Sequence, residues 1–213
     1  MARMLTGTLT LGLALGLTGI VVAQEQPKGI IGIGTMVFHP DIQKELKLSD
    51  EQTGKLKESL GKVMAKYEND FAKFQKSPPK SEEVEKVSKA FTDDSRTAIA
   101  GVLDAKQMKR FQQILWQLIG ATALLDPELH KELKLSNEQK MKLEEVFKDR
   151  TKKILEMQKA GELSKEKYDA VIKDTEQKAN GVLTEEQQKS YKELKGPKFE
   201  ISPPPPPKKQ KSA

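Results

Sequence analysis

One five-residue pattern occurs four times in this chain, and each occurrence predicts the start of a helix. A leucine is followed by Ser, Thr or Asp, then by two polar or small residues, then by Gln, at positions 48–52, 103–107, 135–139 and 183–187. The Ser, Thr or Asp can cap a helix by accepting a hydrogen bond from a backbone N–H one turn on, and the Gln can bond back to the N–H of the cap. The predicted capping pairs are Ser49 with Gln52, Asp104 with Gln107, Ser136 with Gln139, and Thr184 with Gln187.

The two halves of the chain also resemble each other. Residues 39–52 realign with residues 126–139, and the later parts realign after a gap, so the second copy is shorter between its long helices. Pro at the first helical position opens a short helix in each copy, because a helix does not use the N–H that Pro lacks. The pattern predicts an all-α fold without a sheet. We expect two tandem repeats of a helical hairpin unit with long amphipathic helices, at 39–125 and 126–196.

The long helices are expected to bury one apolar stripe each. From Leu56 to Phe74, apolar residues recur at steps of three and four, which is the period of one helix face. The segment 111–125, which joins the two copies, is more uniformly apolar. A helix that is apolar nearly all round is usually buried on several sides. We therefore expect this segment to pack against both repeats.

The two ends of the chain differ from its middle. Residues 1–23 have a basic start, an apolar run and small residues at the end, which predicts a signal peptide cleaved near Ala23. The run is about long enough to span a bilayer, so an uncleaved anchor is the alternative. Residues 24–38 are interpreted as a linker whose apolar part could still pack on the folded body. Residues 197–213 are interpreted as a disordered tail rich in Pro and Lys. The protein is therefore expected to be periplasmic or secreted.

The composition argues against catalysis, metal binding and nucleic-acid recognition. The chain has no cysteine, which excludes disulfides and thiolate metal sites. Its two histidines, His39 and His130, have no second ligand at a usual metal spacing, so capping or surface roles are expected for them. The net charge of +6 is not concentrated on the part expected to fold, as it would be in a nucleic-acid-binding domain. We predict no catalytic residues, no cofactor, no metal and no specific nucleic acid.

The repeated helix starts, behind a signal peptide and in a chain rich in Lys and Glu, resemble the Spy/CpxP family of bacterial envelope proteins. The LTxxQ motif of that family is matched fully at 183–187, the copies at 48–52 and 135–139 carry Ser in place of Thr, and the copy at 103–107 is the loosest. The resemblance covers residues 39–196, here as a tandem duplication, without the His clusters of the metal-linked members. It implies an all-helical periplasmic protein that acts as an ATP-independent chaperone or envelope-stress adaptor and forms a homodimer.

Two classes of function remain open. In the first, the helices hold unfolded or envelope proteins through apolar groups that face outward, and the candidate client-binding residues are Met64, Phe71, Phe74 and Trp116. In the second, the protein is a structural or regulatory part of the cell envelope and has no chaperone activity. In either class the basic C-terminal tail could contact an anionic membrane or a cell-wall polymer.

Overall fold

The chain is all-α, as predicted. The computed structural model describes residues 32–76 and 81–202, and within these ranges the regular structure is helical, without a strand. None of the helices in the described part combines the length and the apolarity needed to cross a membrane. The predicted signal peptide, with its cleavage point near Ala23, lies outside the described residues, as does the tail from 203 to 213.

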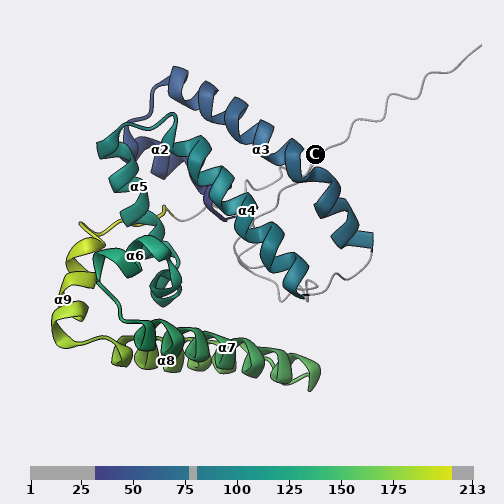
Figure 1. Cartoon of the computed structure of the whole chain (residues 1–213), viewed down its shortest axis with the longest axis vertical. Coiled ribbons are helices and arrows are strands. Elements are labelled where there is room, and N and C mark those ends of the chain that lie inside the picture. Colours follow the sequence, from purple (N-terminus) through teal and green to yellow (C-terminus); the bar gives the residue numbers. More distant parts are fainter. Residues whose placement is uncertain (1–31, 77–80, 203–213) are drawn as a thin grey trace, which may run out of the picture.

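The first unit consists of a long helical hairpin and three shorter helices. Its elements are α1 (Gly32–Met36), α2 (Pro40–Leu46), α3 (Asp50–Lys76), α4 (Ser81–Ala100) and α5 (Ala105–Leu118). Helices α3 and α4 pack along each other, and α1 packs against α4 (Figure 1). Within the predicted linker, Gly32–Met36 form α1, and Val37 directly after it is fully buried among the apolar residues of this unit.

A second helical hairpin, α7 with α8, has shorter helices than the first and belongs to what we call the second unit. The elements of this unit are η1 (Gly120–Leu125, a 3-10 helix), α6 (Pro127–Glu132), α7 (Asn137–Lys159), α8 (Lys165–Val182) and α9 (Glu185–Leu194). Figure 1 shows the α3–α4 and α7–α8 hairpins extending from the same side of a junction formed by α5, α6 and α9. The connection from α7 to α8 turns at Gly161, whose positive φ of 68° is a conformation that favours glycine.

Each unit has its own apolar core, and α5 contributes to both. Phe111, Ile114 and Leu115 belong to the core of the first unit, together with residues such as Ile42 and Leu56. Trp116 belongs to the core of the second unit, where it joins residues from η1, α6, α7, α8 and α9. The segment that joins the two copies therefore packs against both, as its uniform apolarity predicts.

The glutamines of the repeated pattern do more than cap helices. Gln52 at the start of α3 and Gln107 at the start of α5 hydrogen-bond to each other through their side-chain amides, with N–O distances of 2.7 and 3.2 Å. The remaining N–H of Gln52 reaches the Val102 carbonyl at 3.2 Å, and that of Gln107 reaches the Leu46 carbonyl at 3.1 Å. The ends of α2 and α4 are thereby tied to the starts of α3 and α5.

The same set of bonds recurs in the second unit at the positions that the predicted repeat makes equivalent. Gln139 and Gln187 bond to each other at 2.6 and 3.2 Å, and they reach the carbonyls of Val182 and Leu133 at 3.0 and 3.1 Å. We call these two arrangements the glutamine pairs.

Each of the four glutamines in these pairs also caps the helix on which it lies. The Oε1 of each glutamine accepts from the backbone N–H of its own cap residue, and each cap side chain accepts from the backbone N–H of the glutamine. The bonds lie between Ser49 and Gln52, Asp104 and Gln107, Ser136 and Gln139, and Thr184 and Gln187. Each amide thus uses two donors and two acceptor positions, which is its full capacity. Glu would serve as well in a capping box, but it cannot donate.

The C-terminal end of the described chain crosses back to the first unit. After α9, the Pro197 carbonyl accepts from Arg110 at 2.9 Å, and the Phe199 N–H donates to Gln117 Oε1 at 2.8 Å. The Ser202 N–H then donates to Asp41 Oδ2 on α2 at 2.7 Å, and Phe199 packs on the first core. Residues 197–202, which the sequence assigns to the tail, therefore form a strap that contacts the first unit.

The glutamine pairs generate a stability prediction. Gln139→Glu keeps the capping acceptor but removes both donors and places a carboxylate against an amide oxygen, so we expect the free energy of unfolding to fall by about 2–3 kcal/mol. Ser136→Ala removes one capping bond only and should cost about 1 kcal/mol. Urea unfolding followed by circular dichroism at pH 7 measures both. Equal losses in the two variants would show that capping alone accounts for the motif.

Candidate functional site

An apolar groove lies on the first unit between α1, α3 and α4. Its cavity volume is about 240 Å³. The residues that line it are Gly34, Thr35, Phe38, Lys57, Leu60, Gly61, Met64, Phe91 and Ser95. Lys57 is the single charged residue among them. We call this cavity the α1–α3–α4 groove.

Three side chains give the groove its chemical character. Met64 is 45% exposed, which is high for a large apolar residue beside a cavity. Ser95 is 1% exposed, and its hydroxyl has no hydrogen-bond partner within the described part of the chain. Phe91 is buried on one side of the groove and contacts Tyr67 and Phe71 edge-on, with ring centroids 5.4 and 5.3 Å apart. The groove therefore combines an adaptable apolar side chain with one buried polar atom.

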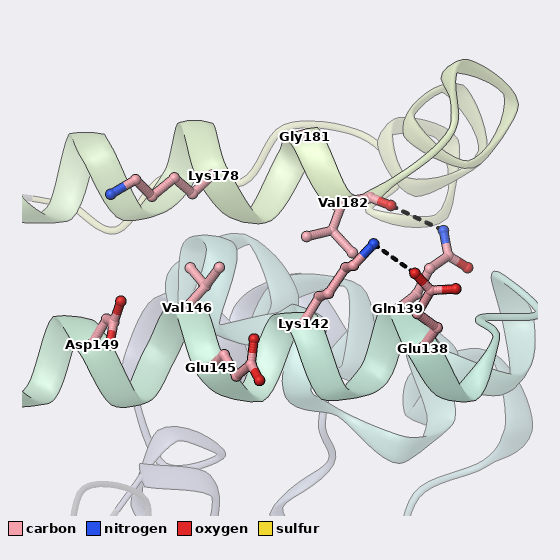
Figure 2. A pocket seen from close by; sticks show the side chains of 9 residues that line it. All are labelled: Glu138, Gln139, Lys142, Glu145, Val146, Asp149, Lys178, Gly181 and Val182. Atoms are coloured by element: carbon pink, nitrogen blue, oxygen red, sulfur yellow. Dashed lines mark hydrogen bonds and ion pairs between the residues drawn. The ribbon is translucent and has the colours of Figure 1, made fainter.

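A second, larger cavity between α7 and α8 is lined mainly by charged groups. It measures about 620 Å³ and includes Glu138, Lys142, Glu145, Asp149 and Lys178 (Figure 2). Lys142 pairs with Glu138 at 2.7 Å, and this pair lowers the pKa of the Glu138 carboxyl. No group of three or more His, Cys, Asp or Glu residues among those described is arranged to hold a metal ion. We interpret this cavity as a solvated charged surface between two helices.

Of the four residues predicted to bind clients, three lie on α3 and the fourth, Trp116, lies on α5. Met64 faces outward at the groove, whereas Phe71 and Phe74 are half-buried on α3. Phe71 packs against the buried ring of Phe91, so it supports the hairpin as well as facing solvent. The prediction of an outward-facing Trp116 is wrong: this side chain is only 5% exposed. It is buried because α5 lies between the two cores.

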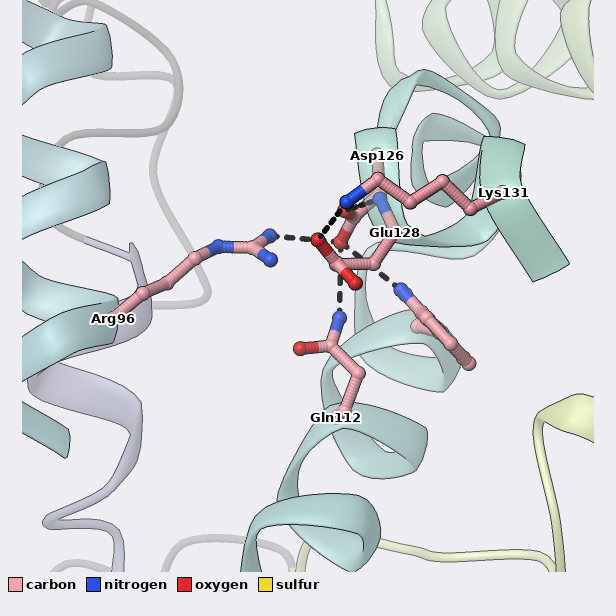
Figure 3. Close-up of polar contacts among 6 residues, drawn as sticks. Arg96, Gln112, Asp126, Glu128 and Lys131 are labelled. Atoms are coloured by element: carbon pink, nitrogen blue, oxygen red, sulfur yellow. Dashed lines mark hydrogen bonds and ion pairs between the residues drawn. The ribbon is translucent and has the colours of Figure 1, made fainter. Parts of the chain in front are cut away.

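Trp116 belongs to a polar cluster around Asp126 that joins the two units. Asp126 Oδ2 accepts from Arg96 of α4 at 2.7 Å, from Gln112 at 2.9 Å and from the Trp116 indole N–H at 3.1 Å (Figure 3). Its other oxygen, Oδ1, accepts from the Glu128 N–H at 3.0 Å and caps α6. A single carboxylate thus connects α4 and α5 with α6.

The charge of this carboxylate is stabilised by its donors. Burial alone would raise the pKa of Asp126, but the Arg96 guanidinium and the N–H groups of Trp116 and Glu128 outweigh burial, and the pKa lies below its ordinary value of 3.8. The sequence predicts Asp126 only as the residue before a helix-opening Pro. The acidic side chain of Asp126 at a cap position could have indicated its capping role. Its other hydrogen-bond partners come from distant elements, so the sequence could not indicate them.

The two histidines occupy capping or structural positions. The Nδ1 of His39 accepts from the Asp41 N–H at 3.3 Å at the start of α2. The Nε2 of His130 lies 2.6 Å from the Leu124 carbonyl, where it can only donate. The His39 contact is a cap of the kind that the sequence predicts, whereas His130 is half-buried and bonds to a carbonyl of η1.

The Asp126 cluster predicts a specific effect of removing its cation. Arg96→Met leaves a buried carboxylate without its charge partner, and we expect the free energy of unfolding to fall by about 3 kcal/mol at pH 7. Because the folded-state pKa is lowered, this stabilisation is present above the unfolded-state pKa near 3.8 and is lost as pH falls through the folded-state value. In Arg96→Met the pKa should rise, so acid unfolding should begin at a higher pH.

Urea and acid unfolding followed by the fluorescence of Trp116, the one tryptophan in the chain, measure this directly. Lys131→Met is the matched control, because its ion pair with Glu128 at 3.1 Å is exposed and should be worth less than about 1 kcal/mol. Similar losses in both variants would contradict the role assigned to the cluster.

No family model matches the chain, and neither a curated protein nor a solved structure matches significantly. The likeness to the Spy/CpxP family therefore depends on the repeated motif and stays a prediction.

Proposed function

We propose that the protein is a periplasmic or secreted helical binding protein that holds unfolded or envelope proteins without ATP, as an ATP-independent chaperone or envelope-stress adaptor similar to the Spy/CpxP family. The observation that carries this proposal is the α1–α3–α4 groove, where Met64 is 45% exposed beside a cavity of about 240 Å³. Contiguous exposed apolar surface marks partner-binding sites, and the groove joins Met64 to the apolar side chains of Phe38, Leu60 and Phe91.

The type of exposed apolar residue supports a binding surface with broad tolerance. The two most exposed large hydrophobic residues of the described chain are methionines, Met141 at 59% and Met64 at 45%. Methionine is unbranched and polarisable, so it adapts to apolar partners of different shapes and is common on promiscuous binding surfaces. A chaperone needs such tolerance because its clients differ in sequence.

The charges of the hairpin helices are compatible with reversible binding. Exposed Lys and acidic residues pair one turn apart, as in Lys55 with Glu51 at 2.6 Å and Lys62 with Glu58 at 2.6 Å. Such pairs contribute little to stability and keep the exposed helix faces near neutrality. Apolar surface can therefore stay exposed on a helix that is still well solvated.

An aggregation assay tests the function. Residues 24–213, the mature chain that the predicted signal peptide implies, should slow the aggregation of reduced or acid-unfolded clients without ATP at a near-equal molar ratio. Met64→Ser should weaken this effect, because it removes the exposed apolar group at the groove. The measurement is light scattering of several unrelated clients.

Met141→Ser is the matched control, since it removes an even more exposed methionine from α7, away from the groove. Phe71→Ser and Phe74→Ser are less direct tests, because Phe71 also packs against Phe91. Helix content of each variant is checked by circular dichroism. If the wild-type protein slows the aggregation of none of the clients, the chaperone proposal is wrong. A structural or regulatory role in the cell envelope is then the better proposal.

A further inference from the structure

We propose that the α1–α3–α4 groove binds the chain's own run of five prolines, residues 203–207, which directly follows the strap. We call this run the proline segment, and it lies outside the described residues. The inference concerns the groove of the proposed function, but it does not depend on that function. It is carried by the place where the strap ends, by the reach of the proline segment and by the chemistry of the groove.

The strap fixes the point at which the proline segment starts. Ser202 donates through its backbone N–H and its hydroxyl to the two carboxylate oxygens of Asp41 on α2, at 2.7 and 3.2 Å. Phe199 packs on the core of the first unit, to which Phe38 and Leu60 of the groove also belong. In Figure 1 the strap, in yellow, returns from α9 toward α2. The proline segment therefore starts on the first unit, at the core that supports the groove.

The proline segment is long enough to reach the groove from this point. Phe38, which lines the groove, is three residues from Asp41, so the Cα atoms of the two residues are at most about 11 Å apart. A run of prolines favours the polyproline II conformation, which rises about 3.1 Å per residue, so five prolines span about 15 Å. A tether this short also gives the segment an effective concentration at the groove on the order of 1 mM, which a separate partner lacks.

The walls of the groove suit a run of prolines. Phe38 is half-buried and Met64 is exposed, and Leu60 and Phe91 are buried beneath them. Grooves with aromatic walls are common binding sites for proline-rich segments, because the polyproline II conformation is preformed and loses little entropy on binding. Proline also has no N–H, so a proline segment leaves no unpaired backbone donor on an apolar surface. The groove therefore fits this segment better than an ordinary extended chain.

The one charged residue of the groove can supply a donor to the carbonyls of the proline segment. Lys57 is exposed and makes no ion pair within the described residues, whereas Lys55 and Lys62 on the same helix each pair with a glutamate. A cation already plays this part in the strap, where Arg110 donates to the Pro197 carbonyl at 2.9 Å. The polar requirement of a proline segment, which is for donors only, is thus met at the groove.

The charges beyond the groove match the sequence that follows the prolines. Glu68 lies one turn beyond Met64 on the same face of α3, is exposed and makes no ion pair within the described residues. Residues 208–211 read Lys-Lys-Gln-Lys. A chain that runs from Asp41 along the groove toward Met64 brings these lysines toward the Glu68 carboxylate. Opposite charges at this end favour the docked arrangement, and they do so less at high salt.

Methionine methyl NMR of the mature chain tests the docking without any client. Two variants are compared with it: one ends at Ser202, and the other keeps the length and the lysines of the tail but carries alternating Gly and Ser in place of the five prolines. The Met64 methyl signal of the mature chain should differ in chemical shift from that of both variants, which should agree with each other. The Met141 signal should be the same in all three. Residues 24–202 are unchanged throughout, so the comparison does not depend on the stability of a substituted core.

A spin label tests where the tail lies. The chain has no cysteine, so Gln210→Cys provides a single site for a nitroxide. In the mature chain the nitroxide should abolish the Met64 methyl signal and leave the Met141 signal visible, and chemical reduction of the nitroxide should restore the Met64 signal. The same label on the Gly and Ser tail should leave the Met64 signal visible.

Changes on the groove side complete the test with the same label. An added Cβ at Gly61 meets no heavy atom within 4 Å, so Gly61→Phe can place a ring in the groove, and it should keep the Met64 signal visible. Gly54→Phe is the matched control, because this glycine lies on the same helix in equally open space and outside the groove. Both changes replace a helical glycine and should leave the fold intact. Glu68→Gln should weaken the loss of the Met64 signal, whereas Glu58→Gln, which removes an exposed pair with Lys62, should not.

The inference is overturned if the Met64 chemical shift is the same in the mature chain and in both tail variants, or if Gly61→Phe and Gly54→Phe behave alike. It is also overturned if the nitroxide on one chain abolishes the Met64 signal of a second, unlabelled chain in a mixture, because the tail then occupies the groove of another copy.

The proposed function is tested separately with the variant that ends at Ser202. This variant should suppress client aggregation more strongly than the mature chain, because clients no longer compete with the proline segment. If the NMR results hold and suppression is unchanged, clients bind elsewhere, and the docking of the tail stands without the client site. If the Met64 chemical shift is the same in all three chains but Met64→Ser weakens suppression, the proposed function stands and the docking is wrong.

Discussion

The fold depends on the two glutamine pairs, in which side-chain amides join the starts of two helices to the ends of two others. Each amide is saturated by its own cap, by its partner glutamine and by a carbonyl at a helix end. Partly buried polar groups of this kind stabilise one arrangement when every donor and acceptor is used, and they are costly when one is lost. The pair in the first unit fixes the base of the α3–α4 hairpin, and the groove lies farther along the same two helices.

A second level of polar contact joins the units. The Asp126 carboxylate links α4 and α5 to α6, and the strap of residues 197–202 returns from the second unit to α2. Both contacts reinforce the apolar junction in which α5 supplies residues to each core. The two hairpins are therefore held together at the junction, and their distal ends extend away from it (Figure 1).

The elements that could be predicted from the sequence depend on local interactions. The capping residues, the helix starts at 49, 104, 136 and 184, and the burial of segment 111–125 follow from patterns within a few turns of chain. The pairing of Gln52 with Gln107, the partners of Asp126 and the groove around Ser95 bring together distant residues, and no local pattern encodes those distances. One clue was present: the third helical position is Gln in all four motifs, although Glu caps equally well.

The outward-facing role predicted for Trp116 failed for the same reason, because the burial of this side chain depends on the distant elements that pack against α5. In the proposed function, unfolded clients contact the α1–α3–α4 groove. The most direct measurement of this contact is the NMR spectrum of the methionine methyl groups during titration with an acid-unfolded client. The Met64 signal should shift or broaden while that of Met141, which is more exposed, stays unchanged. An unchanged Met64 signal in a protein that suppresses aggregation, or equal changes at both methionines, would contradict the account.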